Sequence, residues 1–117
     1  MLPADVVRLL HMRDAAREAV TFAAGRSRDD LDDDRMLVPA LVKDVEIIGE
    51  AASQVGQATR DSLPAIPWPN MVTMRHRLVH AYFDINLDTV WNTVTEDLPP
   101  LLAELEKALA RQPPPLD

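Results

Sequence analysis

The sequence predicts an all-α protein, folded as an antiparallel bundle of four to five helices. Apolar residues recur at steps of three and four along most of the chain, which is the spacing of one helix face. Strand-like alternation is nearly absent, and glycine is scarce. Apolar residues make up 47% of the 117 residues, enough for one core in a single domain of ordinary size.

The first helix is expected from near residue 3 to Ala24. Pro3 is acceptable in a first helical turn, and Gly25 is a plausible stop. The face that should point inward carries Val6, Leu9, Leu10, Ala16, Val20 and Ala23. The polar connector "GRSRDDLDDDR" follows, in which Ser27 and Asp30 have the spacing of a helix cap. Its aspartates favour a solvated helix start over a metal site, because their spacing matches no metal-binding loop.

The second helix is expected from about Asp34 to Thr59. Pro39 lies close enough to its start to be tolerated. Gly49 and Gly56 are seven residues apart and share a face with Ala52, which predicts close approach of another helix. The inward positions are Leu37, Leu41, Val45, Ile48, Ala52 and Val55.

The segment "LPAIPWPN" breaks the chain, because three prolines exclude a helix interior. A third helix should begin near Pro69 or Asn70 and carry a cluster of histidines. A fourth element follows from about Leu87, and Pro99 and Pro100 should bend or restart it before the last helix, "LLAELEKALARQ". Its inward residues are Val90, Trp91, Val94 and Leu98. One helical domain over residues 1–111 and a proline-rich tail over 112–117 are therefore expected.

Composition limits the function classes. The chain has no cysteine, so disulfides and thiolate metal sites are excluded, and a reducing cytoplasm is compatible. The N-terminus lacks the apolar stretch of a signal peptide, and no segment is long enough to span a membrane. The formal net charge is −7, so any nucleic acid must bind at a local site and not across a basic surface.

The most informative stretch is "MRHRLVHAYFDIN", residues 74–86, which holds two of the three histidines and the single tyrosine. On one regular helix, Arg75 and Tyr82 are nearly eclipsed, and His76 and His80 are neighbours. Arg75 and His80, however, diverge by roughly 140°. Their convergence requires the helix to end or distort near His80, or a second copy of the motif across a two-fold axis. A homodimer is therefore part of the hypothesis.

These residue types suit phosphodiester chemistry. Histidine titrates near neutral pH, so His80 can take a proton from an RNA 2′-hydroxyl, which then attacks the adjacent phosphate without a metal. Arginine presents a planar fork of donors that matches a phosphate, so Arg75 can stabilise the developing charge. Tyr82 can position the substrate.

Simpler interpretations remain open for the same residues. A histidine on a helix is more often structural than catalytic. His76 and His80 have zinc-ligand spacing, but the glutamate of the H-E-x-x-H motif is missing, since residues 77–79 are Arg, Leu and Val. Tyr82 can be an amphipathic core residue with its hydroxyl at the edge.

The segment "RHRLVHAY" resembles the R-x4-H-x-Y signature of HEPN domains, specifically the HepT-like family, with Arg75, His80 and Tyr82 at the three motif positions. The segments "VEIIGEAASQV", "IPW" and "MRHRLVHAYFDINLDTVW" are also similar to that family, so the resemblance covers nearly the whole chain. One departure is His76, where the family usually has asparagine directly after the motif arginine.

The resemblance implies a homodimeric bundle whose motifs line a shared cleft. It implies a metal-independent ribonuclease without a cofactor, acting as the toxin of a toxin–antitoxin pair. Its partner would be a minimal nucleotidyltransferase antitoxin of the MntA type, which can transfer AMP to the motif tyrosine, here Tyr82. The added phosphate and bulk would oppose an anionic RNA backbone.

The leading hypothesis is therefore an RNA endonuclease toxin, with Arg75 and His80 as catalytic residues. His76, Tyr82 and Arg77 are auxiliary, and Tyr82 is the modification site. A second hypothesis is a non-enzymatic binding module that docks the nucleotidyltransferase and is modified by it, which the acidic net charge favours. A third is a structural helical dimer without nucleotide chemistry.

Overall fold

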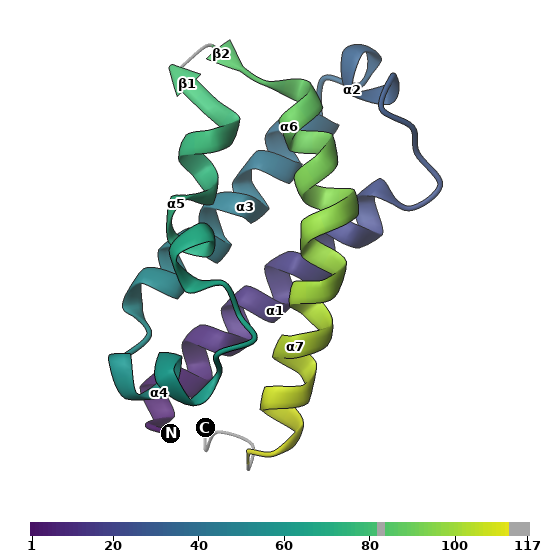
Figure 1. The fold of residues 1–117 in the computed structure, drawn as a ribbon. Helices are drawn as coiled ribbons and strands as arrows, with labels where there is room; N and C mark the ends of the chain where they lie inside the picture. The colour runs from purple at the N-terminus through teal and green to yellow at the C-terminus, as the bar shows by residue number, and fades with distance from the viewer. Residues whose placement is uncertain (82–83, 113–117) are drawn as a thin grey trace.

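The computed structural model describes residues 1–81 and 84–112, and most of them are helical (Figure 1). The predicted all-α bundle is confirmed. Its long helices are α1 (Pro3–Ala23), α3 (Leu37–Gln54), α5 (Trp68–Leu78) and α7 (Leu98–Ala110). The short elements are α2 (Asp30–Asp33), α4 (Gln57–Ser62), α6 (Leu87–Asn92), the π-helical turn η1 (Thr93–Asp97), and the strands β1 (Val79–Ala81) and β2 (Asp84–Ile85).

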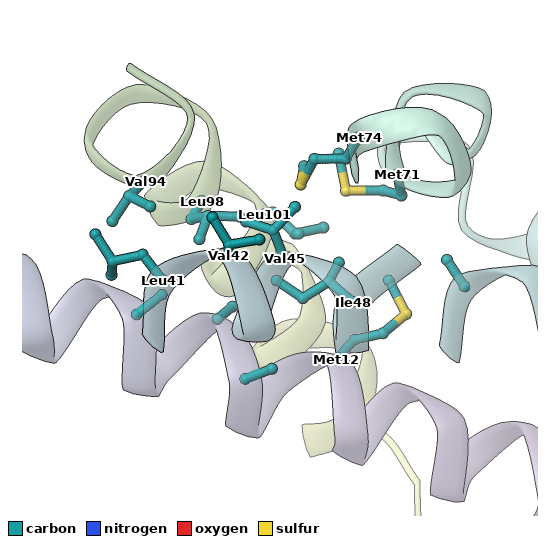
Figure 2. Close-up of a cluster of buried hydrophobic side chains, with 14 of the residues drawn as sticks. Met12, Leu41, Val42, Val45, Ile48, Met71, Met74, Val94, Leu98 and Leu101 are labelled. Atoms are coloured by element: carbon teal, nitrogen blue, oxygen red, sulfur yellow. The ribbon is translucent and has the colours of Figure 1, made fainter. Parts of the chain in front are cut away.

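One hydrophobic core joins the long helices. Figure 2 shows Met12 of α1, Ile48 of α3, Met74 of α5 and Leu98 of α7 among the side chains that meet there. All four are fully buried. The inward positions predicted for the first, second and fourth helical elements are buried or partly buried, because the apolar stripe of each element must be removed from water.

The polar connector after α1 contains a short helix, but its N-cap is Asp29 without a side-chain cap bond, so the predicted Ser27 cap is only partly formed. Gly25 has a φ of 74°, a left-handed conformation that ends α1 at little steric cost. The Asp30 carboxylate accepts a hydrogen bond from the Ser27 backbone N–H at 2.7 Å, at the start of the short helix α2. Arg26 pairs with Asp34 at 2.7 Å and Arg28 with Asp88 at 2.6 Å, so arginines balance part of the acidic run.

The predicted second helix is wrong at its C-terminal end. α3 stops at Gln54 and α4 begins at Gln57, with Val55 and Gly56 extended between them. One distant side chain and one from the following helix stabilise this break. Asp5 of α1 accepts from the Gly56 N–H at 3.1 Å, and Arg60 donates to the carbonyls of Ala52 and Val55 at 2.9 and 3.0 Å. These contacts satisfy backbone groups that a continuous helix would have paired internally.

The two glycines predicted to pack together have different roles. A Cβ at Gly49 would lie 3.1 Å from the carbonyl oxygen of Met71, so this glycine lets α5 approach α3 closely, as predicted. Gly56 lies outside α3, and a Cβ there would meet the Asp5 carboxylate at 3.4 Å. The Asp5 carboxylate also accepts from the Thr59 hydroxyl at 2.6 Å, and this bond is the main cause that lowers the pKa of Asp5.

The segment from Leu87 onward stays helical and changes to a π turn just before its prolines, so a new α-helix starts there, as the sequence indicated. α6 passes through the π turn η1 into α7, which carries Pro99 and Pro100 in its first turn. A proline has no N–H to donate, and its ring crowds the carbonyl four residues earlier. The π turn precedes these prolines, and Val94 and Leu98 stay in the core.

Within the described part of the chain, no helix is both long and apolar enough to cross a bilayer. Of the predicted tail, residues 113–117 lie outside the described residues.

Candidate active site

The end of α5 differs from the predicted third helix. The helix begins at Trp68 and stops at Leu78, so it carries Arg75 but not His80. His80 lies in β1, which pairs antiparallel with β2, with Val79 opposite Ile85 and Ala81 opposite Asp84. The Asn86 N–H donates to the Leu78 carbonyl at 2.8 Å, and this bond satisfies a carbonyl at the helix end. The sequence predicted that Arg75 and His80 could converge if the helix ended near His80 or if a second copy of the motif lay opposite. The helix end is present in the structure.

Burial fixes which side of α5 faces solvent. Met74 and Leu78 are fully buried four residues apart, and they anchor the last turn against the core. Arg75, His76 and Arg77 lie between them and are exposed. Three basic side chains in the last turn also suit the negative end of the helix dipole. The core contacts of α5 therefore present the polar part of the motif to solvent.

Arg75 is held by an acidic residue of α3. Its Nε donates to Glu46 Oε1 at 2.9 Å, and the Arg75 side chain remains 46% exposed. Across the described residues this is its one side-chain hydrogen bond, so it uses one of the five N–H donors of the guanidinium. The remaining donors can bind an anion such as a phosphate. Because an exposed ion pair is worth roughly 0–1 kcal/mol, Glu46 orients Arg75 without removing it from use.

The auxiliary residues occupy less constrained positions. Arg77 Nη2 makes a long contact of 3.5 Å with the carbonyl oxygen of Asn70, and His76 is exposed. Tyr82 lies outside the described residues. The convergence of Arg75, His80 and Tyr82 therefore stays a prediction.

A groove of about 630 Å³ lies beside Arg75, between α1, α3 and α5. Basic side chains from all three helices line it: Arg8, His11, Lys43 and Arg75. Glu46, Glu50 and Gln54 add acceptors, and Ile47 adds an apolar surface. The groove therefore joins the motif arginine to cationic residues that are remote in the sequence.

A smaller cavity of about 220 Å³ continues from this groove along α1 and α3, sharing His11 and Ile47 with it. Asp44 lines it and is 2% exposed, and its Oδ2 has no hydrogen-bond partner within the described residues. Burial, and then the neighbouring Glu18 carboxylate, raise the pKa of Asp44 to about 7. Asp44 therefore holds its proton to a much higher pH than an ordinary carboxyl group.

A metal site is not formed by the described side chains, because no three of their histidine, aspartate or glutamate residues are grouped to hold an ion. This result does not test a zinc site formed by His76 and His80, because the side chain of His80 lies outside the part of the structure that is described.

Sequence reasoning missed Glu46 and Asp44. Glu46 is 29 positions from Arg75, and no spacing rule connects the two. Asp44 stands among apolar residues of α3, and this position alone was a weak signal of a buried acid.

Comparison of the sequence with family models and with known proteins finds matches to ribonucleases. The family model described as "Ribonuclease HepT-like" matches residues 12–108, a range that includes the groove residues of α3 and the whole 75–82 motif. A "Putative RNase" of Methanocaldococcus jannaschii is 31% identical over 87% of this chain and 94% of its own length. A "Probable ribonuclease HepT" of Thermococcus cleftensis is 41% identical over 58% of this chain and 62% of its own length. No solved structure matches at a significant level.

Proposed function

Because the chain belongs to the HepT-like ribonuclease family, we propose that it is a metal-independent RNA endonuclease and the toxin of a toxin–antitoxin pair. The observation that carries this proposal is the family match across residues 12–108, which contain the complete R-x4-H-x-Y motif. The exposed Arg75 guanidinium beside a large groove supports it, because a phosphate can reach the unused donors.

In the proposed reaction, His80 accepts the proton of an RNA 2′-hydroxyl. The 2′-oxygen forms a bond to the adjacent phosphorus, and the bond from phosphorus to the 5′-oxygen breaks. The products are a 2′,3′-cyclic phosphate and a 5′-hydroxyl end, and the leaving oxygen takes a proton from an imidazolium or from water. Arg75 stabilises the charge that develops on the phosphate oxygens, and Tyr82 contacts the same phosphate.

Charge distribution limits how RNA can bind. The chain has a net charge of −7, so electrostatic attraction must come from a local group of cations. Arg8, Lys43 and Arg75 line one groove, and Arg77 is exposed on the same last turn of α5 as Arg75. His76 adds a donor whose charge depends on pH, where the family usually has asparagine.

The proposed chemistry requires the 2′-hydroxyl, and this gives its first test. We expect the purified chain to cleave RNA in the presence of EDTA and to leave the same sequence intact when every ribose is 2′-O-methylated, because the nucleophile is then blocked. The measurement is gel analysis of end-labelled RNA, with phosphatase resistance of the new 3′ ends as the sign of a cyclic phosphate. Equal cleavage of both substrates, or loss of cleavage with EDTA, would contradict the mechanism.

The proposal includes two protein partners. A second copy of the chain brings two motifs together in one cleft, and a minimal nucleotidyltransferase of the MntA type acts as the antitoxin. This enzyme transfers AMP from ATP to the Tyr82 hydroxyl and releases pyrophosphate. The new phosphate places negative charge where the RNA backbone must approach, and RNA cleavage stops. Because RNA is the target, the proposed location is the cytoplasm.

Replacing Tyr82 with phenylalanine tests the modification separately from cleavage. After mixing with the nucleotidyltransferase and ATP, the wild-type chain should gain AMP-sized increments in intact mass, and the Tyr82→Phe variant should gain none because it lacks the acceptor oxygen. Whatever rate of RNA cleavage the variant has alone, the partner and ATP should not lower that rate further. AMP increments on the phenylalanine variant would show that another residue is the acceptor.

The acidic net charge favours a second candidate function, a binding module that docks the nucleotidyltransferase without cleaving RNA. The RNA-cleavage assay and the AMP-transfer measurement together distinguish the ribonuclease toxin from the binding module. AMP addition to a chain that never cleaves RNA would support docking alone, whereas cleavage by the unmodified chain supports the toxin.

A further inference from the structure

The groove beside Arg75 contains an acidic side chain that phosphate binding does not explain. Glu50 of α3 is exposed and lines the groove together with the cations Arg8, Lys43 and Arg75. Within the described part of the chain Glu50 makes no ion pair, so none of these cations is bonded to it. An unpaired carboxylate repels an RNA backbone. The position of Glu50 therefore indicates a contact with hydrogen-bond donors of the ligand.

Glu50 forms one polar unit with Gln54, which lies one helical turn further along α3. The Gln54 side-chain Nε2 donates to Glu50 Oε1 at 3.4 Å, and this long bond places the amide beside the carboxylate. Both side chains line the groove, and both residues are exposed. The second N–H of the amide remains available next to two carboxylate oxygens. The unit therefore presents a donor followed by two acceptors, which is the order of groups on the Watson–Crick edge of cytosine.

Surfaces suited to the faces of a base lie at the level of Glu50. Ile47 is one turn earlier on α3, is 36% exposed and lines the same groove. α1 and α3 are antiparallel, and Asp5 of α1 contacts Gly56, so His11 lies opposite Glu50 six residues further along. Proteins hold unstacked RNA bases by stacking them on aromatic side chains, histidine included, while the base edge is hydrogen-bonded.

We propose that this part of the groove is a guanine-binding subsite, in which Glu50 and Gln54 recognise the Watson–Crick edge of one unpaired guanine of the RNA substrate. The Glu50 carboxylate accepts from guanine N1–H and from the 2-amino group, and the Gln54 amide donates to guanine O6. Ile47 and His11 cover the faces of the ring. The inference rests on the proposed function, because it takes RNA as the molecule that binds in the groove.

The subsite lies close to the proposed catalytic residues. Arg75 is bonded to Glu46, which precedes Glu50 by one helical turn, or about 6 Å along α3. The antiparallel packing places Arg8 about 10 Å from the level of Glu46, on the far side of Glu50. Phosphates held by Arg75 and by Arg8 therefore leave the base between them at Glu50. The recognised guanine is thus a near neighbour of the phosphate that is cleaved.

The other three bases match the unit less well. Uracil has one donor between two carbonyl oxygens, so one of these oxygens faces a carboxylate oxygen of Glu50. Adenine has an amino donor beside a ring nitrogen that only accepts, and cytosine has the same order of groups as the protein. A bidentate contact discriminates against a wrong base by roughly 5- to 150-fold. Guanine should therefore be selected, and cytosine should bind least well.

The test measures the Kd of a short single-stranded RNA by fluorescence anisotropy with the full chain. The RNA carries one guanine among adenines, and all its riboses are 2′-O-methylated so that it is not cleaved. Replacing the guanine with inosine removes only the 2-amino group and should raise the Kd about 10-fold, since a hydrogen bond to a charged group is lost. Replacing it with 7-deazaguanine, which keeps the Watson–Crick edge, should leave the Kd unchanged.

Glu50→Gln should bring the inosine-to-guanine ratio of Kd values close to one, because the amide sets a donor against the guanine donors. The ratio is the readout because the lost negative charge strengthens the binding of both RNAs alike. Glu96→Gln is the matched control, since it makes the same change at an exposed residue of η1 outside the groove. It should keep the wild-type ratio, and circular dichroism should show the same helix content in both variants.

No measurable binding, equal Kd values for the guanine and inosine RNAs, or a ratio that Glu50→Gln leaves unchanged would overturn the inference. Mapping the cuts in an unmodified RNA of random sequence separates that failure from failure of the proposed function. Cleavage without guanine at a fixed position near the cut would keep the ribonuclease and remove the subsite. A chain that distinguishes guanine from inosine but never cuts RNA would keep the subsite and remove the ribonuclease.

Discussion

Replacing His80 with alanine is expected to lower the rate of RNA cleavage about 10²–10⁴-fold, which is the usual contribution of a positioned acid–base group. Replacing Arg75 with alanine is expected to cost about 10²–10³-fold, because the developing phosphate charge loses its donors. Arg75→Lys should fall between the wild type and Arg75→Ala, since lysine keeps the charge but lacks the planar fork. Single-turnover cleavage of labelled RNA measures all three rates.

The control for these variants is Arg35→Ala, which removes an exposed arginine from the connector before α3 and should cleave as fast as the wild type. Arg75 is 46% exposed, so its replacement should leave thermal unfolding nearly unchanged. His80→Ala needs the same unfolding check. Undiminished cleavage by both site variants would assign the activity to other residues or to a contaminant.

The second large effect is expected in the pH dependence of stability. Asp44 has a folded-state pKa raised to about 7, whereas an unfolded chain releases this proton near pH ~4. Between these values the folded state binds more protons than the unfolded state. The free energy of unfolding should therefore fall as the pH rises from ~4 towards 7 and beyond. Asp5, Asp30 and Asp34 have lowered pKa values, so their opposite effect is confined to lower pH.

Asp44→Asn is expected to remove most of this decline, because asparagine resembles the protonated acid at every pH. Its free energy of unfolding at pH 8 should exceed that of the wild type by an amount on the order of a few kcal/mol, with a much smaller difference at pH 5. Urea unfolding at both pH values measures the effect. It should be repeated at two protein concentrations, so that dimer dissociation is recognised by its concentration dependence.

Asp29→Asn is the matched control, since Asp29 is exposed and its side chain makes no cap hydrogen bond. It should reproduce the wild-type pH dependence. A wild type whose stability is constant or increases from pH 5 to pH 8 would contradict the assignment of a neutral Asp44, and so would an Asp44→Asn variant that is destabilised equally at both pH values.

The candidate site was partly predictable because its residues are neighbours in the sequence. The spacing of Arg75, His80 and Tyr82 identified the motif, and the geometry of a regular helix showed that convergence needs the helix to end or distort near His80, or a second copy of the motif. Leu78 is the last helical residue, in agreement with that requirement. Glu46 was not predictable, because it reaches Arg75 only after α3 and α5 pack together around Gly49.

The sequence by itself determined the helical class, the inward faces of the first and second helices and the motif, because these depend on periodicity and spacing within one element. Only the tertiary structure decided where α3 ends, how Arg75 is held and which cationic side chains line the groove beside it. The physical reason is that each of these features depends on groups from different helices. Asp5 and Arg60 stabilise the break after Gln54, and burial together with Glu18 raises the pKa of Asp44. Such contacts have no local signature and arise only from packing.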